Sequence, residues 1–120
     1  MTEAALALIR RGDRWFLQRR AAGNPVLPGL WEFPGGKAEP PESPRAALRR
    51  EVREELGIEL AAARALPALE GPVRLHPFLV EGPGLPRTDL AWGWFTLDEM
   101  ARLPVPPANS ELIRRLAELP

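Results

Sequence analysis

Three glutamates, Glu51, Glu54 and Glu55, lie in a short charged run that could bind a divalent cation. In an α-helix, at about 100° per residue, Glu54 falls about 60° to one side of Glu51 and Glu55 about 40° to the other. The three carboxylates would therefore share one arc of the helix, where like charges repel one another unless a cation neutralises them. Oxygen ligands of this kind, completed by substrate phosphates, suit Mg²⁺ or Mn²⁺.

The helix that would carry these acids has clear start and stop signals. Ser43 can cap its N-terminus, Pro44 suits the first helical position, and Gly57 suits a left-handed residue at the C-terminal end. These signals predict a helix over residues 44–56. Apolar residues recur at i, i+4 and i+8 and form a stripe that faces the core: Leu48, Val52 and Leu56. The acids should therefore stand at the edge of the buried face.

The helix pattern alone leaves a second interpretation open. Neighbouring glutamates on a helix usually belong to a solvated face, and Arg50 could pair there with Glu54 at i+4. The residues upstream decide in favour of a metal site. Gly36, Glu42 and residues 50–58 (REVREELGI) have the spacing of the Nudix hydrolase signature, and every specified position of that pattern is filled. The chain therefore resembles the Nudix hydrolases.

The Nudix resemblance implies an α/β fold, an α/β/α sandwich around a mixed β-sheet. It also implies an enzyme that hydrolyses phosphoric anhydride bonds with Mg²⁺, for which Mn²⁺ can substitute. The implied ligands are the carboxylates of Glu51, Glu54 and Glu55 and the backbone carbonyl of Gly36.

Two further residues of the signature have implied roles in catalysis. We expect Glu51 to help deprotonate the attacking water, and Arg50 to orient Glu51. Glu42 should brace Arg50 through an ion pair. An exposed acid beside the helix N-terminus remains the alternative for Glu42.

Segments outside the signature resemble the MutT branch of the family: residues 18–22 (QRRAA), 30–37 (LWEFPGGK) and 106–109 (PPAN). MutT-type enzymes hydrolyse oxidised purine nucleoside triphosphates, notably 8-oxo-dGTP, to the monophosphate and pyrophosphate. The resemblance therefore implies sanitation of the nucleotide pool, a DNA-repair role. It also implies substrate-binding residues within these segments: Arg19, Arg20, Glu32, Phe33, Lys37 and Asn109.

Several of these residues have structural alternatives. Arg19 and Arg20 could end a strand in solvent instead of contacting a phosphate or a base edge. Asn109 or Ser110 could cap the final helix, with Glu111 in its first turn. The amide of Asn109 also offers a donor and an acceptor, which is enough to read the edge of a purine.

Other runs of the chain predict the elements around this centre. Apolar segments predict strands over 4–9, 15–19, 73–81 and 91–95, and Pro77 indicates an edge strand or a bulge. Residues 59–66 form either a weak strand or an irregular connector. Thr96 can cap a short helix over 97–103. A final helix carries an apolar stripe: Leu112, Ile113, Leu116 and Leu119.

The composition excludes several other classes of protein. The 120 residues suit one domain over 1–120, and 16 basic residues balance 16 acidic ones, so a general polyanion-binding surface is not indicated. The chain has no cysteine and therefore neither a disulfide framework nor a thiol nucleophile. The single histidine, His76, excludes a histidine-based metal site and suggests a structural role. Asp89 is the nearest candidate for an extra loop acid that some relatives supply.

The lack of membrane-spanning and signal-peptide patterns and the balanced charge lead to further expectations. No apolar run approaches membrane-spanning length and the N-terminus lacks a signal-peptide layout, so we expect a cytoplasmic protein. Its partner should be a small-molecule nucleotide, without stable nucleic-acid or membrane binding.

Three functions fit these observations. The first is hydrolysis of 8-oxo-dGTP in the MutT manner, which Asn109 favours. The second is Nudix hydrolysis of another nucleotide, such as CTP or dCTP, other dNTPs or a nucleoside diphosphate derivative. The third is a non-catalytic module that reads 8-oxoguanine, like the MutT-like domain of the adenine glycosylase MutY. The complete glutamate helix and the neutral charge argue against the third.

Overall fold

A computed structural model describes residues 2–81 and 84–119 of the chain. In this part of the chain one mixed sheet contains seven strands, which are β1 (Thr2–Arg11), β2 (Arg14–Arg19), β3 (Trp31–Glu32), β4 (Gly35–Lys37), β5 (Arg64–Ala65), β6 (Val73–Glu81) and β7 (Trp92–Phe95). The helices are α1 (Pro44–Leu56), α2 (Leu97–Met100) and α3 (Pro107–Leu116).

Strand β1 lies at the centre of the sheet because its apolar residues are buried on both faces. It pairs in parallel with β6 along nearly its whole length, from Thr2 opposite Val73 to Arg10 opposite Glu81. On its other side it forms a hairpin with β2. The strand order is β3-β2-β1-β6-β5, and β7 pairs with the free side of β2.

Residues 31–37 are inserted between β1 and β2 at the end where these two strands diverge. β3 pairs with β2, whereas β4 pairs with β1, with Gly36 opposite Ala5. Between them the Ala7 N–H donates to the Pro34 carbonyl at 2.8 Å. This insertion brings the Gly35–Gly36 backbone to the middle of the sheet.

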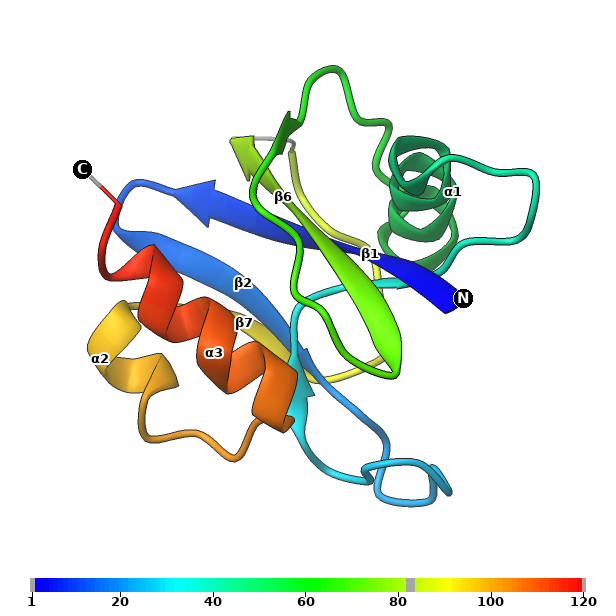
Figure 1. The fold of residues 1–120 in the computed structure, drawn as a ribbon. Helices are drawn as coiled ribbons and strands as arrows, with labels where there is room; N and C mark the ends of the chain where they lie inside the picture. Colours follow the sequence, from blue (N-terminus) through cyan, green and yellow to red (C-terminus); the bar gives the residue numbers. More distant parts are fainter. Residues whose placement is uncertain (1, 82–83, 120) are drawn as a thin grey trace.

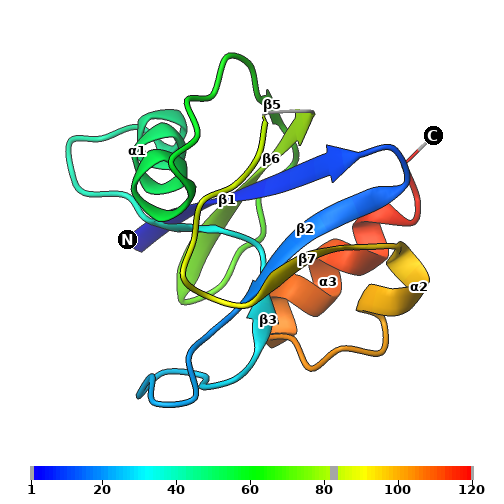
Figure 2. The same ribbon diagram turned by 180° about the vertical axis from the view of Figure 1, so that it is seen from behind.

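The helices cover opposite faces of the sheet, α1 on one and α2 with α3 on the other (Figures 1 and 2). Each face has its own apolar core. The α1 core contains Ala47, Leu48, Val52 and Leu56 against Ala5, Ala7, Ile9, Phe16, Phe78 and Val80. The α3 core contains Leu112, Ile113 and Leu116 against Leu8, Leu17, Phe33 and Met100. The predicted α/β/α sandwich around a mixed sheet is confirmed.

The ends of α1 form as its sequence predicts. The Ser43 side chain accepts a hydrogen bond from the Ala46 N–H at 3.1 Å, and Pro44 is the first helical residue. Gly57 adopts the left-handed conformation, with φ of 67°, and its N–H donates to the Arg53 carbonyl at 3.0 Å. α2 is shorter than predicted but begins, as expected, with Thr96 as its cap, in a capping box with Glu99.

The alternative role of Asn109 or Ser110, as the cap of the final helix, is not observed. α3 begins at Pro107 with Pro106 at the cap position, and no described side chain caps it. Asn109 therefore lies inside the first turn rather than before it. The physical reason is that a proline at the first helical position needs no amide partner and has a suitable φ angle, so the cap lies at Pro106, three residues before Asn109.

In the second half of the chain, the suggestion that Pro77 marks an edge strand needs correction. β6 lies between β1 and β5 and is not an edge strand. The Pro77 carbonyl faces the β5 side, where it accepts from the Leu66 N–H at 2.9 Å. The nitrogen of a strand residue points to the same side as its carbonyl, so the N–H that proline lacks costs no hydrogen bond to β1. In residues 59–66 only Arg64–Ala65 form a strand. None of the helices in the described residues has the length and apolarity needed to span a membrane.

Candidate active site

The acidic edge of α1 lies directly against the Gly35–Gly36 backbone. The Glu55 carboxylate accepts a hydrogen bond from the Gly35 N–H at 3.0 Å. A Cβ atom placed on Gly36 would lie only 2.6 Å from the carboxyl carbon of Glu51. Glycine at position 36 therefore leaves the room that the Glu51 carboxylate occupies. In this way the fold brings together residues that are 15 to 20 positions apart in the signature.

Arg50 connects the acids of this edge. Its Nε and Nη2 atoms lie 2.7 and 3.0 Å from the two carboxylate oxygens of Glu42, the fork geometry in which such pairs are strongest. Its Nη1 atom donates to Glu51 at 2.9 Å and to Glu54 at 3.4 Å. Nη2 also donates to the Lys37 carbonyl at 3.1 Å. The predicted ion pair between Glu42 and Arg50 is present.

This network perturbs both partners of the Arg50–Glu42 pair. The hydrogen bonds from Arg50, and then that from the Glu39 N–H, lower the pKa of Glu42 to about 2. The hydrogen bond to Glu42 in turn raises the pKa of Arg50 above its ordinary value. Arg50 thus stays charged and remains fixed beside Glu51.

Glu55 has the opposite perturbation. Burial, followed by the charges of Glu51, Glu32 and Glu54, raises its pKa to about 7, although the hydrogen bond from Gly35 favours the ionised form. A carboxylate in this position is crowded by other anions and partly withdrawn from water. A divalent cation would relieve both effects at once.

The donor set of this edge fits a hard divalent cation because carboxylate and carbonyl oxygens are the ligands such ions prefer. In the structure, however, Glu51 and Glu54 accept hydrogen bonds from Arg50, and Glu55 accepts one from the Gly35 N–H. Among the described residues, no three His, Cys, Asp or Glu side chains converge closely enough to hold one ion. Binding would therefore require the carboxylates to turn from their protein partners toward the cation.

The predicted substrate arginines contact the loop that follows β2. The Nε atom of Arg19 donates to the Gly29 carbonyl at 2.9 Å, and Nη1 of Arg20 donates to the Val26 carbonyl at 3.1 Å. Arg20 also lies 3.0 Å from Glu32, whose pKa is raised by burial. Neither arginine is a free strand end, because both fix the loop over 21–30.

Phe33 and Asn109 meet just after β3, where the first turn of α3 reaches the backbone of the 31–37 insertion. The Phe33 side chain is 1% exposed and packs in the α3 core, so only its backbone is open to a ligand. Its N–H donates to the Asn109 side-chain oxygen at 2.9 Å.

The Lys37 side chain and Asp89 are exposed. His76 pairs with Glu3 at 3.0 Å, in keeping with a structural role.

The sequence analysis missed two residues on the α1 face of the sheet. Gln18 is 3% exposed and lies between Glu32 of β3 and Trp92 of β7. Trp92 is 39% exposed and its ring centroid lies 5.6 Å from that of Phe16. The sequence contained a signal for Gln18. This polar residue directly follows the apolar run over 15–17 and precedes the basic end of the strand.

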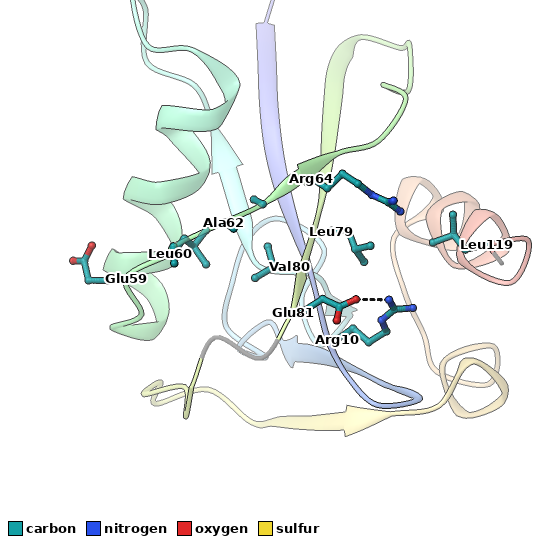
Figure 3. A pocket seen from close by; sticks show the side chains of 11 residues that line it. Arg10, Glu59, Leu60, Ala62, Arg64, Leu79, Val80, Glu81 and Leu119 are labelled. Carbon is teal, nitrogen blue, oxygen red and sulfur yellow. Dashed lines mark hydrogen bonds and ion pairs between the residues drawn. The ribbon is translucent and has the colours of Figure 1, made fainter.

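A pocket of about 730 Å³ lies away from these acids, on the outer side of β6 (Figure 3). Leu60, Leu79 and Val80 form its apolar part, and an ion pair between Arg10 and Glu81 lies at its edge. The acids of α1 do not line it. The candidate chemistry therefore belongs to the open edge of α1 rather than to this pocket.

Comparisons with known proteins identify the family and agree with the fold. A family model described as NUDIX domain matches residues 1–116. The chain is 35% identical to the CTP pyrophosphohydrolase of Escherichia coli, covering 99% of this chain and 93% of that protein. It is 37% identical to a putative 8-oxo-dGTP diphosphatase 2 of Mycobacterium tuberculosis, covering 78% and 72%. A crystal structure of a MutT NUDIX hydrolase from Burkholderia pseudomallei superposes with a TM-score of 0.84 at 29% identity, covering 95% and 96%.

Proposed function

We propose that this chain, which belongs to the NUDIX domain family and is a hydrolase of phosphoric anhydride bonds, is a Mg²⁺-dependent pyrophosphohydrolase of nucleoside triphosphates. We further propose a MutT-type preference for 8-oxo-dGTP, which it would convert to 8-oxo-dGMP and pyrophosphate. The observation that carries the proposal is the contact of the Glu51 and Glu55 carboxylates with the Gly35–Gly36 backbone. This contact brings the glycine segment and the glutamates of the signature together at one oxygen-rich edge.

The metal residues in this proposal are Glu51, Glu54, Glu55 and the Gly36 carbonyl. Nudix hydrolases generally use a divalent metal such as Mg²⁺. When bound, the cation would neutralise the triphosphate and make a water more acidic, so that two anionic partners can meet. Mn²⁺ should substitute because it accepts the same oxygen ligands.

The protein groups that act on the water and the phosphates follow from the contacts around Arg50. Glu51 receives the proton of the water that attacks the β-phosphorus. Arg50 holds Glu51 in place through its 2.9 Å hydrogen bond, and Glu42 fixes Arg50 through the two-oxygen contact. In this proposal Glu42 acts through Arg50 and does not touch the substrate.

The substrate-side residues are proposed on their positions around the same edge. Arg19 and Arg20 fix the 21–30 loop, and the exposed Lys37 follows Gly36, where it can approach phosphate oxygens. The side-chain oxygen of Asn109 is bound to the Phe33 N–H, so its amide nitrogen remains to donate to a base carbonyl. A carbonyl such as O6 of oxidised guanine meets that requirement.

A second substrate, CTP or dCTP, is supported by a separate observation. The relative that covers 99% of this chain at 35% identity is a CTP pyrophosphohydrolase. Cytosine also presents a carbonyl acceptor, so the Asn109 argument does not by itself separate the two bases.

A substrate panel tests the proposal directly. Pyrophosphate release would be measured with Mg²⁺ for 8-oxo-dGTP, the four ordinary dNTPs and CTP. We expect the highest kcat/KM for 8-oxo-dGTP, whereas a highest value for CTP would establish the second candidate. Tight binding to DNA that contains 8-oxoguanine, without hydrolysis of any nucleotide, would contradict both and indicate a recognition module.

A further inference from the structure

Gln18 has a buried polar group without a protein partner. Its side chain is 3% exposed, and among the described residues its amide oxygen has no hydrogen-bond partner. Buried acceptors are satisfied in the great majority of native proteins, because an unpaired one loses its bonds to water without replacement. The environment of Gln18 therefore calls for a donor.

The neighbours of Gln18 identify the side of the molecule on which such a donor would arrive. Glu32 and Trp92 are its direct cross-strand partners, so the three side chains lie on one face of the sheet. Phe16, two residues earlier on the same strand, contacts Trp92 and packs in the α1 core. The face is thus the one that α1 covers with its acidic edge.

The row formed by Glu32, Gln18 and Trp92, here called the β2 row, is continuous with the candidate active site. Glu32 lies three residues before Gly35, whose N–H donates to the Glu55 carboxylate at 3.0 Å. At the other end Trp92 offers a partly exposed indole on which a flat ring can stack. A nucleotide whose phosphates lie at the acids of α1 would have its base directed along this row.

The β2 row contains two side-chain oxygens that can accept hydrogen bonds from a ligand. Glu32 is a carboxylate, and the unpaired atom of Gln18 is an oxygen. A base that places N–H groups here would donate to both oxygens once the Gln18 amide turns its oxygen toward the base. Exocyclic amino groups, as in guanine and cytosine, supply such donors, but hypoxanthine and uracil lack them.

We propose that Gln18 is a specificity-determining residue of the substrate site, and that its amide oxygen accepts a hydrogen bond from the exocyclic amino group of a nucleobase stacked on Trp92. This inference rests on the proposed nucleotide hydrolysis. It adds a criterion to that function, because it selects amino-bearing bases independently of oxidation at the purine ring. Since the oxygen is covered in the structure, the amide turns about its last side-chain bond when the base arrives.

The test compares nucleotides that differ at the amino group. Pyrophosphate release would be measured for dGTP against dITP and for CTP against UTP. We expect the protein to favour the amino-bearing member by at least about tenfold in kcat/KM in each pair that it hydrolyses, the size expected for one hydrogen bond to a base. Gln18→Met keeps the length of the side chain and should reduce the preference below about threefold. Gln18→Glu keeps an acceptor and should restore the preference.

His76→Met is the matched control, because His76 is a half-buried polar residue of the same sheet that pairs with Glu3, away from the β2 row. It should leave the preference unchanged, and melting temperatures would show that each variant folds. An unchanged preference in folded Gln18→Met, or equal rates within both pairs for the unmodified protein, would overturn the inference alone. Absence of hydrolysis with every nucleotide would instead overturn the proposed function on which it rests.

Discussion

The two long helices cover opposite faces of the same sheet but use their charges differently. On α3, Glu111 pairs with Arg114 and Arg115 on the solvent side, and the inner face is apolar apart from Asn109. On α1 the charged groups stand at the margin of the core, where Glu51 and Arg50 have side chains that are each 18% exposed. Surface pairs such as those of α3 contribute little to stability.

The difference shows which charges need an explanation beyond stability. Nothing opposes the solvation of the α3 pairs, so their loss should be nearly neutral. On α1 the fold keeps Glu55 partly buried among three other carboxylates, which raises its pKa to about 7. An arrangement that works against the folded state is typical of a functional site.

The largest effect should come from replacing the proposed base on α1. Glu51→Gln keeps the shape of the side chain but cannot accept the proton of the attacking water, so kcat should fall by about 10²- to 10⁴-fold. Glu111→Gln on α3 is the matched control and should retain activity. Steady-state pyrophosphate release and thermal melting would be measured for both. Near-normal turnover in Glu51→Gln would remove this residue as the base.

Substitution of the adjacent glycines Gly35 and Gly36 should distinguish a residue needed for activity from one needed for folding. A methyl group on Gly36 would push against the end of the Glu51 side chain, so Gly36→Ala should lower activity by about tenfold or more with a small change in melting temperature. Gly35 has φ of 145°, and a Cβ atom there would lie 2.0 Å from the Ala5 carbonyl oxygen. Gly35→Ala should therefore unfold the protein or destabilise it by about 3 kcal/mol or more.

Denaturation and activity measured on both glycine variants would test this distinction. If Gly36→Ala lost stability as severely as Gly35→Ala, the close contact at Gly36 would be a packing requirement, and its link to the Glu51 carboxylate would fail.

A smaller effect concerns the stability of metal-free protein. The pKa of Glu55 is about 7 when folded, against an ordinary value of 4.5. Between these values the folded state binds more protons than the unfolded state, so the free energy of unfolding should decrease as the pH rises through this window, by on the order of 3 kcal/mol at most. Glu55→Gln removes the titrating group but keeps an acceptor for the Gly35 N–H.

In a chelating buffer Glu55→Gln should therefore melt higher than the unmodified protein at pH 8 and at a similar temperature at pH 4, while losing activity with Mg²⁺. Melting curves recorded across this range would show it. Parallel pH profiles for the two proteins would contradict the crowded environment assigned to Glu55.

Local sequence signals predicted the parts of the molecule that depend on local physics. The cap at Ser43, the left-handed Gly57 and the apolar stripe of α1 need only neighbouring residues, and all three are present. The alternative that Asn109 or Ser110 caps α3 is not realised, because the preceding prolines start the helix earlier. Within the site, the pairing of Glu42 with Arg50 was predicted from the signature.

Contacts between distant segments were beyond such reasoning. The bond from the Phe33 N–H to Asn109 joins residues 76 positions apart, and the insertion of 31–37 between β1 and β2 depends on how the hairpin diverges. For the same reason the sequence did not reveal that Gln18 lies between Glu32 and Trp92. Cross-strand neighbours follow from register, which no single strand specifies.

The central claim is that the acidic edge of α1 holds divalent cations, and titration with Mn²⁺ tests it most directly. Electron paramagnetic resonance would follow the loss of the free Mn²⁺ signal as protein is added. The account predicts saturable binding that weakens at least about tenfold in the double variant Glu51→Gln with Glu55→Gln and stays unchanged in Glu111→Gln. Equal Mn²⁺ binding by the double variant and the unmodified protein would contradict it.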